Sequence, residues 1–216
     1  MEAKVIEKEV DPINNKEVSN VTNVLDFLYI CQKLKQTKRT GWLNHGIKNP
    51  ESISDHMHRM SILALLCNDD SLDRDRCVKM TVVHDLAESK VGDITPLDGI
   101  SKEEKHRLEE GAMRHLCTDL LGNTPQSKEI FELWQEYENA ETAEALFVKD
   151  LDKFEMLLQA FEYEKSDKKD LTEFFESASN KIQHPLVKRW ANELYVQREE
   201  YKKKQNHWVL NQQIIN

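Results

Sequence analysis

A histidine, an aspartate and a glutamate lie close together in an otherwise apolar stretch, residues 82–89. His84 and Glu88 are four residues apart and Asp85 and Glu88 are three apart, so a helix spreads the three side chains over neighbouring parts of one surface. Burying an imidazole and carboxylates in such a helix is unfavourable unless hydrogen bonds or a cation satisfy them. The stretch therefore predicts either a metal site or an internally hydrogen-bonded polar core.

The elements that position these side chains are predicted to be helices. Glycine and proline are scarce, at 6 and 5 residues, and runs of alternating β-branched residues are missing, so the sequence predicts an all-α fold. Residues 140–163 are apolar around most of a helical circumference, which is typical of a central helix. Periodicity and capping residues place helices at 19–34, 52–67, 73–90, 101–121, 125–137, 140–163, 171–179 and 185–203, with loops at 38–46 and 92–96.

We expect one folded domain with short extensions at both ends. Residues 1–18 are polar and unpatterned and predict a flexible arm, residues 19–203 form the domain, and residues 204–216 form a tail. The first helix carries apolar residues at three- and four-residue steps, which predicts a face turned toward the core: Val21, Leu25, Leu28, Cys31 and Leu34.

Charge and composition exclude several functions. The 216 residues include 30 basic and 39 acidic side chains, and the net charge of -9 disfavours binding to a nucleic-acid polymer. No apolar window is long enough for a membrane span, and the charged N-terminus does not resemble a signal peptide, so we expect a cytoplasmic or nuclear protein. The four cysteines, without any C-x-x-C pair, predict reduced thiols: Cys31, Cys67, Cys77 and Cys117.

Four short motifs resemble a known family. They are Ser54-Asp-His56, Val83-His-Asp-Leu-Ala-Glu88, Val91-Gly-Asp93-Ile and Val148-Lys-Asp-Leu-Asp152-Lys. In this order and spacing they resemble the HD-domain metal-dependent phosphohydrolases, and within them the 5′-deoxynucleotidase group, over residues 20–195. The resemblance implies an all-helical and usually dimeric HD domain that hydrolyses deoxynucleoside 5′-monophosphates.

The resemblance also implies which side chains hold a metal. His56, His84, Asp85 and Asp152 match the metal ligands of the family. Two imidazoles and two carboxylates suit manganese, cobalt, iron, zinc or magnesium, and the sequence does not select among them.

Further residues match roles around that metal. Glu88 matches the residue that positions the attacking water, and Asp93 matches a nearby carboxylate. Glu88, Asp93 and the carbonyl of Ile94 match a possible second cation site, so the number of cations stays open. Arg39 and Trp42 resemble substrate-binding residues, although Thr40-Gly41 separates a pair that is contiguous in bacterial members.

Other polar residues compete with these assignments. His58 is two residues from His56 on a helix, so at most one of them faces the site, and the resemblance selects His56. Helical periodicity leaves Asp150 and Asp152 as alternatives, and only the resemblance selects Asp152. The remaining histidines are interpreted as surface or structural residues: His45, His106, His115, His184 and His207.

The predicted reaction is attack of a metal-activated water on a phosphomonoester. A metal spreads the charge of the dianion, and no D-x-D, G-x-S-x-G or P-loop motif indicates a phospho-enzyme. Two alternatives stay open on the sequence. One is another HD reaction, on cyclic nucleotides or deoxynucleoside triphosphates, and the other is a non-catalytic helical interaction module that holds a structural metal.

Overall fold

The computed structural model describes the backbone of residues 15–215 and the side chains of residues 21 and 23–205. These residues form helices and turns with one isolated β-bridge, between Lys38 and Ser52, which confirms the predicted all-α class. No described helix is both long enough and apolar enough to span a membrane. The elements are α1 (Asn15–Gln36), α2 (Thr40–Asn44), α3 (Ile53–Leu65), α4 (Arg74–Val83), α5 (Glu88–Val91), the 3₁₀ turn η1 (Pro96–Asp98), α6 (Lys102–Arg114), the π-helical η2 (His115–Leu120), α7 (Pro125–Asn139), α8 (Ala143–Ser166), α9 (Thr172–Ala178) and α10 (Pro185–Ile215).

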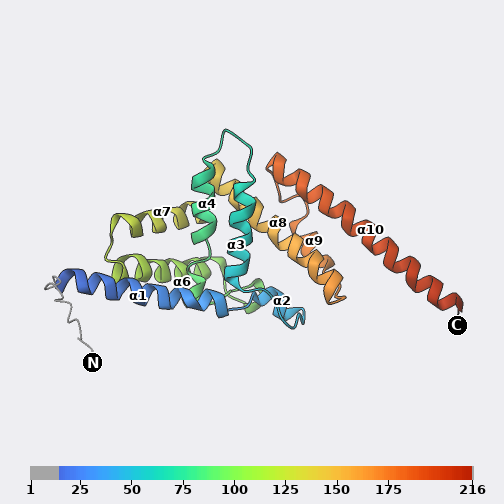
Figure 1. The fold of residues 1–216 in the computed structure, drawn as a ribbon, viewed down its shortest axis with the longest axis horizontal. Helices are drawn as coiled ribbons and strands as arrows, with labels where there is room; N and C mark the ends of the chain where they lie inside the picture. The colour runs from blue at the N-terminus through green and yellow to red at the C-terminus, as the bar shows by residue number, and fades with distance from the viewer. Residues whose placement is uncertain (1–14, 216) are drawn as a thin grey trace, which may run out of the picture.

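Helix α8 lies at the centre of the fold (Figure 1). It packs against α3, α4 and α7 on one side and against α9 and α10 on the other. Helices α6 and α7 lie to the left of α3 and α4 in Figure 1, and α1 runs below them, where it packs against α3, α5 and η2. Helix α8 therefore connects two groups of helices.

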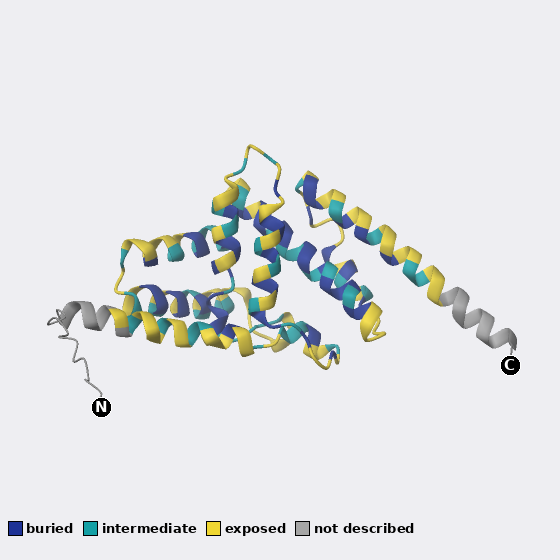
Figure 2. Cartoon of the chain, viewed as in Figure 1, coloured by how far each residue is buried: buried dark blue, intermediate teal, exposed yellow. Residues whose placement is uncertain are grey.

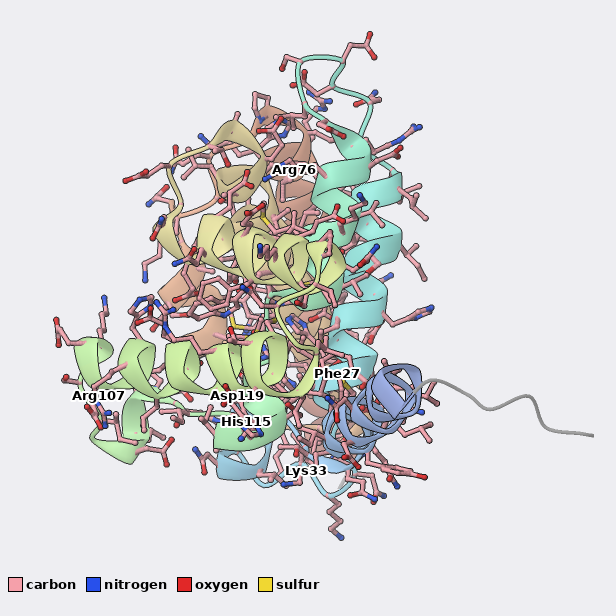
Figure 3. The ribbon with its side chains drawn as sticks, turned by 90° about the vertical axis from the view of Figure 1, so that its left-hand side faces the viewer. Phe27, Lys33, Arg76, Arg107, His115 and Asp119 are labelled. Atoms are coloured by element: carbon pink, nitrogen blue, oxygen red, sulfur yellow. The ribbon has the colours of Figure 1, made fainter. Side chains whose placement is uncertain are left out.

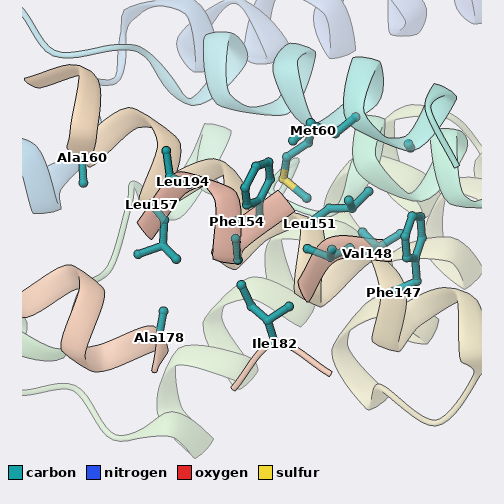
Figure 4. Packing of buried hydrophobic residues seen from close by; sticks show 14 of the residues in the cluster. Met60, Phe147, Val148, Leu151, Phe154, Leu157, Ala160, Ala178, Ile182 and Leu194 are labelled. Atoms are coloured by element: carbon teal, nitrogen blue, oxygen red, sulfur yellow. The ribbon is translucent and has the colours of Figure 1, made fainter. Parts of the chain in front are cut away.

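The composition of α8 explains its central place. Most of its large apolar side chains are buried, although Leu146 is 53% exposed, and each buried one contributes about 1.5–3 kcal/mol to folding by leaving water. The prediction of a central helix is thereby confirmed. Figure 4 shows these side chains packed among Met60 of α3, Leu194 of α10 and Ile182, which precedes α10. The buried side chains of α8 in this view are Phe147, Val148, Leu151, Phe154 and Leu157.

Figure 2 shows the buried residues of each helix in dark blue, and the apolar ones among them form two clusters. The first, centred on α8, includes Met60 and Val83. The second lies among α1, α3, α6, η2 and α7 and includes Leu86, Ala87 and Trp134. Since Val83 belongs to one cluster and Leu86 to the other, the chain crosses between them at residues 84 and 85.

Helix α4 ends at this crossing, which corrects the prediction of one helix over residues 73–90. The backbone N–H of His84 still bonds to the Met80 carbonyl, but the next bonds, from Leu86 to Val83 and from Glu88 to Asp85, span only three residues. Two side chains also bond to backbone carbonyls here: the His84 imidazole to Thr81 and the Ser89 hydroxyl to Leu86. Side-chain donors thus compete with the regular helical ladder, and α5 begins as a separate short helix.

Several other boundaries differ from the prediction. Helix α1 begins at Asn15, inside the predicted arm of residues 1–18, and residues 1–14 lie outside the described part. Helix α10 continues to Ile215, through the predicted tail of residues 204–216, although side chains beyond residue 205 are not described. The predicted loop at residues 38–46 contains α2. The division into arm, domain and tail stays a prediction.

The apolar face of α1 is only partly buried. Leu34 is buried and Cys31 is half-buried, whereas Val21, Leu25 and Leu28 are exposed by 62%, 46% and 52%. The prediction that this whole face packs on the core of the chain is therefore wrong for its first half. The second cluster covers only the C-terminal half of α1, because α3, α5 and η2 contact it there.

Candidate functional site

The predicted site residues surround one cavity of about 710 Å³. Its wall is built from α2, the turn after α4, the segment that leads into η1, and parts of α6, α7, α8 and α9. His56 lies behind this wall and is fully buried. The predicted site residues on the wall are Arg39, Trp42, His84, Asp85, Glu88, Asp93, Ile94 and Asp152.

Helix capping fixes the place of His56. Ser52 is the N-cap of α3, since its hydroxyl accepts a bond from the backbone N–H of Asp55 at 3.2 Å. The Asp55 carboxylate accepts the backbone N–H of Ser52 at 2.7 Å, which completes a capping box. His56 follows in the first turn, on the face of α3 that packs against α8.

Four polar side chains from distant parts of the sequence converge beside the cavity. Nε2 of His56 lies 3.3 Å from Oδ1 of Asp152 and 3.8 Å from Oδ2 of Asp85, and Nε2 of His84 lies 3.2 Å from the same Asp85 oxygen. The donor atoms of His56, His84 and Asp152 all lie within 4.8 Å of one another. Ligand atoms that share one cation at about 2.1 Å are about 3–4 Å apart, so the predicted ligands are brought together.

The hydrogen bonds of the two histidines leave a nitrogen on each for a metal. Nδ1 of His56 donates to Glu155 at 2.5 Å, and Nδ1 of His84 donates to the Thr81 carbonyl at 3.0 Å. A carboxylate and a carbonyl oxygen only accept, so each Nδ1 carries a hydrogen, and Nε2 is the atom of each ring that offers a lone pair when the ring is neutral. Both Nε2 atoms are buried without a hydrogen bond. This pattern fits imidazoles that bind a metal through Nε2 while Nδ1 donates to a neighbouring oxygen.

The charges around these ligands favour a cation. Burial opposes the ionisation of Asp152, but the neighbouring His56 and His84 outweigh it and hold the pKa of Asp152 well below its usual range. Burial likewise opposes a charge on His56, and the carboxylates of Glu155 and Asp152 outweigh it and raise the pKa of His56 to about 10. A divalent cation competes with that proton for Nε2.

Glu88 is the buried carboxyl nearest to this group on the α5 side. Its side chain lines the cavity, the residue is 4% exposed, and its Oε2 atom has no hydrogen-bond partner. Burial and the negative charges of Asp85 and Asp93 raise the pKa of Glu88 well above its usual value. A carboxyl with a raised pKa and an unpaired oxygen is suited to hold or accept a proton.

Asp93 and Ile94 form the part of the wall after α5. Oδ2 of Asp93 accepts the backbone N–H of Thr40 at 2.5 Å, and the Asp93 carbonyl accepts the Thr40 hydroxyl at 2.8 Å, which connects this segment to the start of α2. The Ile94 carbonyl accepts a bond from Nζ of Lys105 at 3.3 Å. The ammonium group of Lys105 thus occupies the Ile94 carbonyl, which is one of the three groups of the predicted second cation site.

Arg39 and Trp42 occupy the α2 side of the cavity. Nη1 of Arg39 lies 3.4 Å from Oδ2 of Asp85. Burial works against the charge of Arg39, but Asp85, Asp93 and other carboxylates outweigh it and raise the pKa of the guanidinium further. Trp42 is 2% exposed, and its indole N–H donates to Glu51 at 2.9 Å. Trp42 therefore packs in the core as well as lining the cavity.

The competing residues lie elsewhere. His58 is exposed, as predicted, whereas His56 is fully buried. Asp150 accepts the backbone N–H groups of Gln183 and His184 at 2.6 and 2.7 Å, so it holds the segment before α10. Of the two aspartates that the helical periodicity left as alternatives, Asp152 lies in the cluster with His56 and His84 and Asp150 does not.

Two of the histidines interpreted as surface or structural residues also line the cavity. His45 pairs with Glu173 of α9, and its Nδ1 lies 2.7 Å from the Gly41 carbonyl. His106 of α6 stacks on Trp134 at 5.7 Å between ring centroids.

The other three histidines are outside the cavity wall or outside the described side chains. His115 pairs with Asp119 at 3.2 Å on the outer face that Figure 3 shows. His184 lies 3.2 Å from Asp69. The side chain of His207 lies outside the described residues.

Sequence reasoning missed three residues that touch the site. The Tyr137 hydroxyl donates to Oδ2 of Asp152 at 2.8 Å, and its ring lies against His84 at 4.9 Å. Lys105 bonds to Ile94, and Glu155 bonds to His56. These contacts join residues far apart in sequence, so no local spacing indicates them.

Comparisons with known proteins agree with this geometry. An HD domain family model matches residues 31–195. The chain is 54% identical over 183 residues to 5′-deoxynucleotidase hdd1 of Schizosaccharomyces pombe, which covers 83% of this chain and 92% of that protein. It is 48% identical over 178 residues to 5′-deoxynucleotidase HDDC2 of Homo sapiens, which covers 82% of this chain and 86% of that protein.

Solved structures are similar as well. HD domain-containing protein YGK1 (YGL101W) aligns with a TM-score of 0.66 at 35% identity, over 88% of this chain and 90% of that chain. A predicted metal-dependent phosphohydrolase of Magnetospirillum magnetotacticum MS-1 aligns with a TM-score of 0.66 at 26% identity, over 84% and 96%. The matched part includes the cavity and the four converging side chains.

Proposed function

The chain belongs to the HD domain family, and from this membership we propose that it is a metal-dependent 5′-deoxynucleotidase. It hydrolyses deoxynucleoside 5′-monophosphates to deoxynucleoside and phosphate, the activity that the names of its relatives state. The observation that carries the proposal is the pair of buried Nε2 atoms, of His56 and His84, which lie beside Asp85 and Asp152 without hydrogen bonds.

The ligand set supports metal chemistry in this proposal. Held by His56, His84, Asp85 and Asp152, a divalent cation supplies Lewis acidity to a phosphoryl oxygen and lowers the pKa of a water toward about 7. The mixed imidazole and carboxylate donors suit manganese, cobalt, iron, zinc or magnesium.

Glu88 orients the attacking water and accepts its proton. Its unpaired buried Oε2 is available for that bond, and the raised pKa makes the ionised carboxylate a stronger base. A cation nearby favours the ionised form of the carboxyl. General-base catalysis of this kind contributes about 10²–10⁴-fold to the rate.

Arg39 and Asp93 act on the phosphate and the leaving group. The Arg39 guanidinium faces the cavity beside Asp85 and neutralises part of the phosphate dianion. Asp93 or a solvent molecule protonates the departing 5′-oxygen, and the attack is in line, without a phospho-enzyme. Trp42 contributes an apolar surface on the same side of the cavity.

A second cation is a separate part of the proposal. Glu88, Asp93 and the Ile94 carbonyl offer three oxygen atoms on one side of the cavity. Lys105 donates to that carbonyl at 3.3 Å, so a second cation has to displace its ammonium group. Measuring metal stoichiometry in the Lys105→Met variant tests this part, and we expect a second equivalent to bind more tightly than in the wild type.

The direct test removes the metal. We expect chelator-treated protein to lose phosphate release from deoxynucleoside monophosphates and to regain it with manganese or cobalt. Unchanged release without metal contradicts the proposal. A panel with cyclic nucleotides and deoxynucleoside triphosphates separates the other HD reactions, and failure with all substrates and metals indicates a non-catalytic module.

Two variants distinguish the role of a metal ligand, proposed for Asp85, from that of a general base, proposed for Glu88. We expect Glu88→Ala to retain the cation and to lose about 10²–10⁴-fold in turnover, whereas Asp85→Ala loses both. Metal analysis of the purified variants gives the measurement. Equal loss of metal in both identifies Glu88 as a ligand instead.

We further propose that the chain forms a homodimer through α1. Val21, Leu25 and Leu28 form an exposed apolar stripe on this helix, and a two-fold interface covers the same surface on both copies. Analytical ultracentrifugation of Leu25→Glu is the test: we expect a monomer, and an unchanged dimer excludes this face. A location in the cytoplasm or nucleus stays a prediction.

A further inference from the structure

Glu155 lies one turn after Asp152 on α8 and is fully buried. Its two oxygens accept bonds from opposite sides: Oε2 from Nδ1 of His56 at 2.5 Å and Oε1 from Nε of Arg59 at 2.7 Å. We infer that Glu155, held by Arg59, is a positioning residue that fixes the His56 ring for cation binding. This inference rests on the proposed function, because His56 is one of the cation ligands in that proposal.

The two helices place these groups in register. His56 and Arg59 are three residues apart on α3, and Asp152 and Glu155 are three residues apart on α8, so each helix contributes one ligand and one supporting side chain. Nε2 of His56 lies 3.3 Å from Asp152 while its Nδ1 is bonded to Glu155. The imidazole is therefore held between two carboxylates of the same helix.

The side chain of Arg59, from α3, is held by hydrogen bonds to residues of α8. Its Nη2 donates to Gln159 at 2.6 Å and its Nη1 donates to Glu162 at 2.8 Å, in addition to the bond from Nε to Glu155. The Arg59 side chain is 26% exposed, so this chain of contacts runs from the surface to the buried ligand. A guanidinium at this place keeps the buried Glu155 carboxylate paired on the side that faces away from His56.

The expected effect is on metal affinity. A carboxylate behind a ligating histidine fixes the tautomer and the ring orientation and makes the free nitrogen a better donor. Loss of such a partner lowers metal affinity by about 10–100-fold. A buried ion pair that is only structural has a different signature, because replacing it changes stability and leaves a distant ligand unaffected.

The same helix contains a matched pair without any ligand. Glu164, also buried, accepts bonds from Nε and Nη2 of Arg198 at 2.7 and 2.6 Å, and from the backbone N–H of Leu171 at 3.3 Å. None of these partners lines the cavity or contacts a proposed cation ligand. Glu164→Gln therefore makes the same chemical change as Glu155→Gln, on the same helix, away from the cation site.

The experiment compares the two variants by Mn²⁺ affinity, measured by competition with a fluorescent chelator on full-length protein. We expect Glu155→Gln to weaken Mn²⁺ binding about 10–100-fold and to change the visible absorption of the Co²⁺ form, and Glu164→Gln to leave both at the wild-type values. Equal Mn²⁺ affinity in Glu155→Gln and the wild type overturns the inference. Equal weakening in both variants does so too, because it indicates a general loss of structure.

A second variant keeps the test decisive if Glu155→Gln does not fold. Arg59→Gln removes the outer partner at a partly exposed position, and we expect it to weaken Mn²⁺ binding in the same direction by a smaller factor. Wild-type affinity in Arg59→Gln contradicts the role of Arg59. If the wild type itself binds no Mn²⁺ in this titration, the proposed function fails, whereas a binding wild type with an unaffected Glu155→Gln removes only this inference.

Discussion

Helix α8 contributes to two acidic regions, one at Glu164 and one at Asp152, whose polar atoms differ in their hydrogen bonds. At Glu164 both carboxylate oxygens are bonded to Arg198. Around Asp152 three buried atoms from neighbouring elements have no hydrogen bond: Nε2 of His56, Nε2 of His84 and Oε2 of Glu88. Buried polar groups are nearly always paired. The first region meets this rule within the protein, whereas the second leaves atoms unpaired that the proposed cation would satisfy.

The contrast separates charge burial from function. Glu164 is buried, and so are the His56 and His84 rings beside Asp152, so both regions must overcome the desolvation of buried polar groups. At Glu164 the guanidinium of Arg198 pairs both carboxylate oxygens. At Asp152 the donors that face each other are lone pairs and carboxylates, for which a cation is the natural partner.

The largest expected effect distinguishes two aspartates of α8. Asp152→Asn should lower phosphate release by about 10³-fold or more, because the cation and its several kcal/mol of transition-state stabilisation are lost. Asp150→Asn changes the same group two residues away, where the carboxylate bonds to Gln183 and His184. It should retain the metal and lose stability instead. Metal content and kcat/KM are the measurements, and metal loss in both variants contradicts the contrast.

Breaking the completed pair should affect folding alone. Arg198→Met leaves Glu164 buried without its guanidinium and should destabilise the protein by about 3–5 kcal/mol. Urea unfolding at neutral pH measures this. The kcat/KM of the folded fraction should stay at the wild-type value, since Arg198 contacts Glu164, Thr172 and the Phe175 ring and no cavity ligand. A loss of kcat/KM in the folded fraction contradicts the prediction that this pair contributes to stability only.

A smaller effect is expected at Tyr137. Tyr137→Phe removes the donor to Oδ2 of Asp152, and a net hydrogen bond of about 1 kcal/mol corresponds to a loss of roughly tenfold or less in kcat/KM. Tyr195→Phe is the matched control, since its hydroxyl contacts the Phe175 carbonyl at 3.4 Å outside the cavity. Similar losses in both variants point to a general packing effect.

The smallest effect is a pH dependence at Glu109. Burial raises its pKa to about 6, with Glu138 and Asp85 adding to the shift and Lys105 opposing it. The folded state thus binds the proton more tightly than the unfolded state, so the stabilisation is complete below about pH 4.5 and is lost as pH rises through 6. Glu109→Gln should remove a pH-dependent term well under about 2 kcal/mol. Parallel stability curves for both proteins over pH 4–7 contradict this prediction.

Much of the fold was predictable from local patterns. The mostly apolar circumference of α8 indicated its central place, and Ser101 and Pro125 marked helix starts, because caps and periodicity act within one or two turns. Ser52 and Ser54 were alternative caps for α3, and the structure has Ser52. The end of α4 at Val83 was not predictable in this way. It depends on side-chain bonds to carbonyls and on the change of hydrophobic cluster between Val83 and Leu86.

The site was predictable where it depends on types and short spacing. His84, Asp85 and Glu88 share one segment, so their proximity followed from sequence alone, whereas the choice of Asp152 over Asp150 needed the family pattern. Tyr137 and Glu155 enter the site only because α7 and α3 pack against α8. The exposed half of α1 was equally hidden, because periodicity indicates an apolar face but not what covers it.

The site lies where the chain passes from one hydrophobic cluster to the other. Residues 56, 84 and 152 come from α3, from the turn after α4 and from α8, so an ion that binds all three cross-links these segments. Such an ion binds only the folded arrangement and stabilises it by mass action. If the proposed cation binds, metal supply would therefore affect the folded fraction of the protein as well as its turnover.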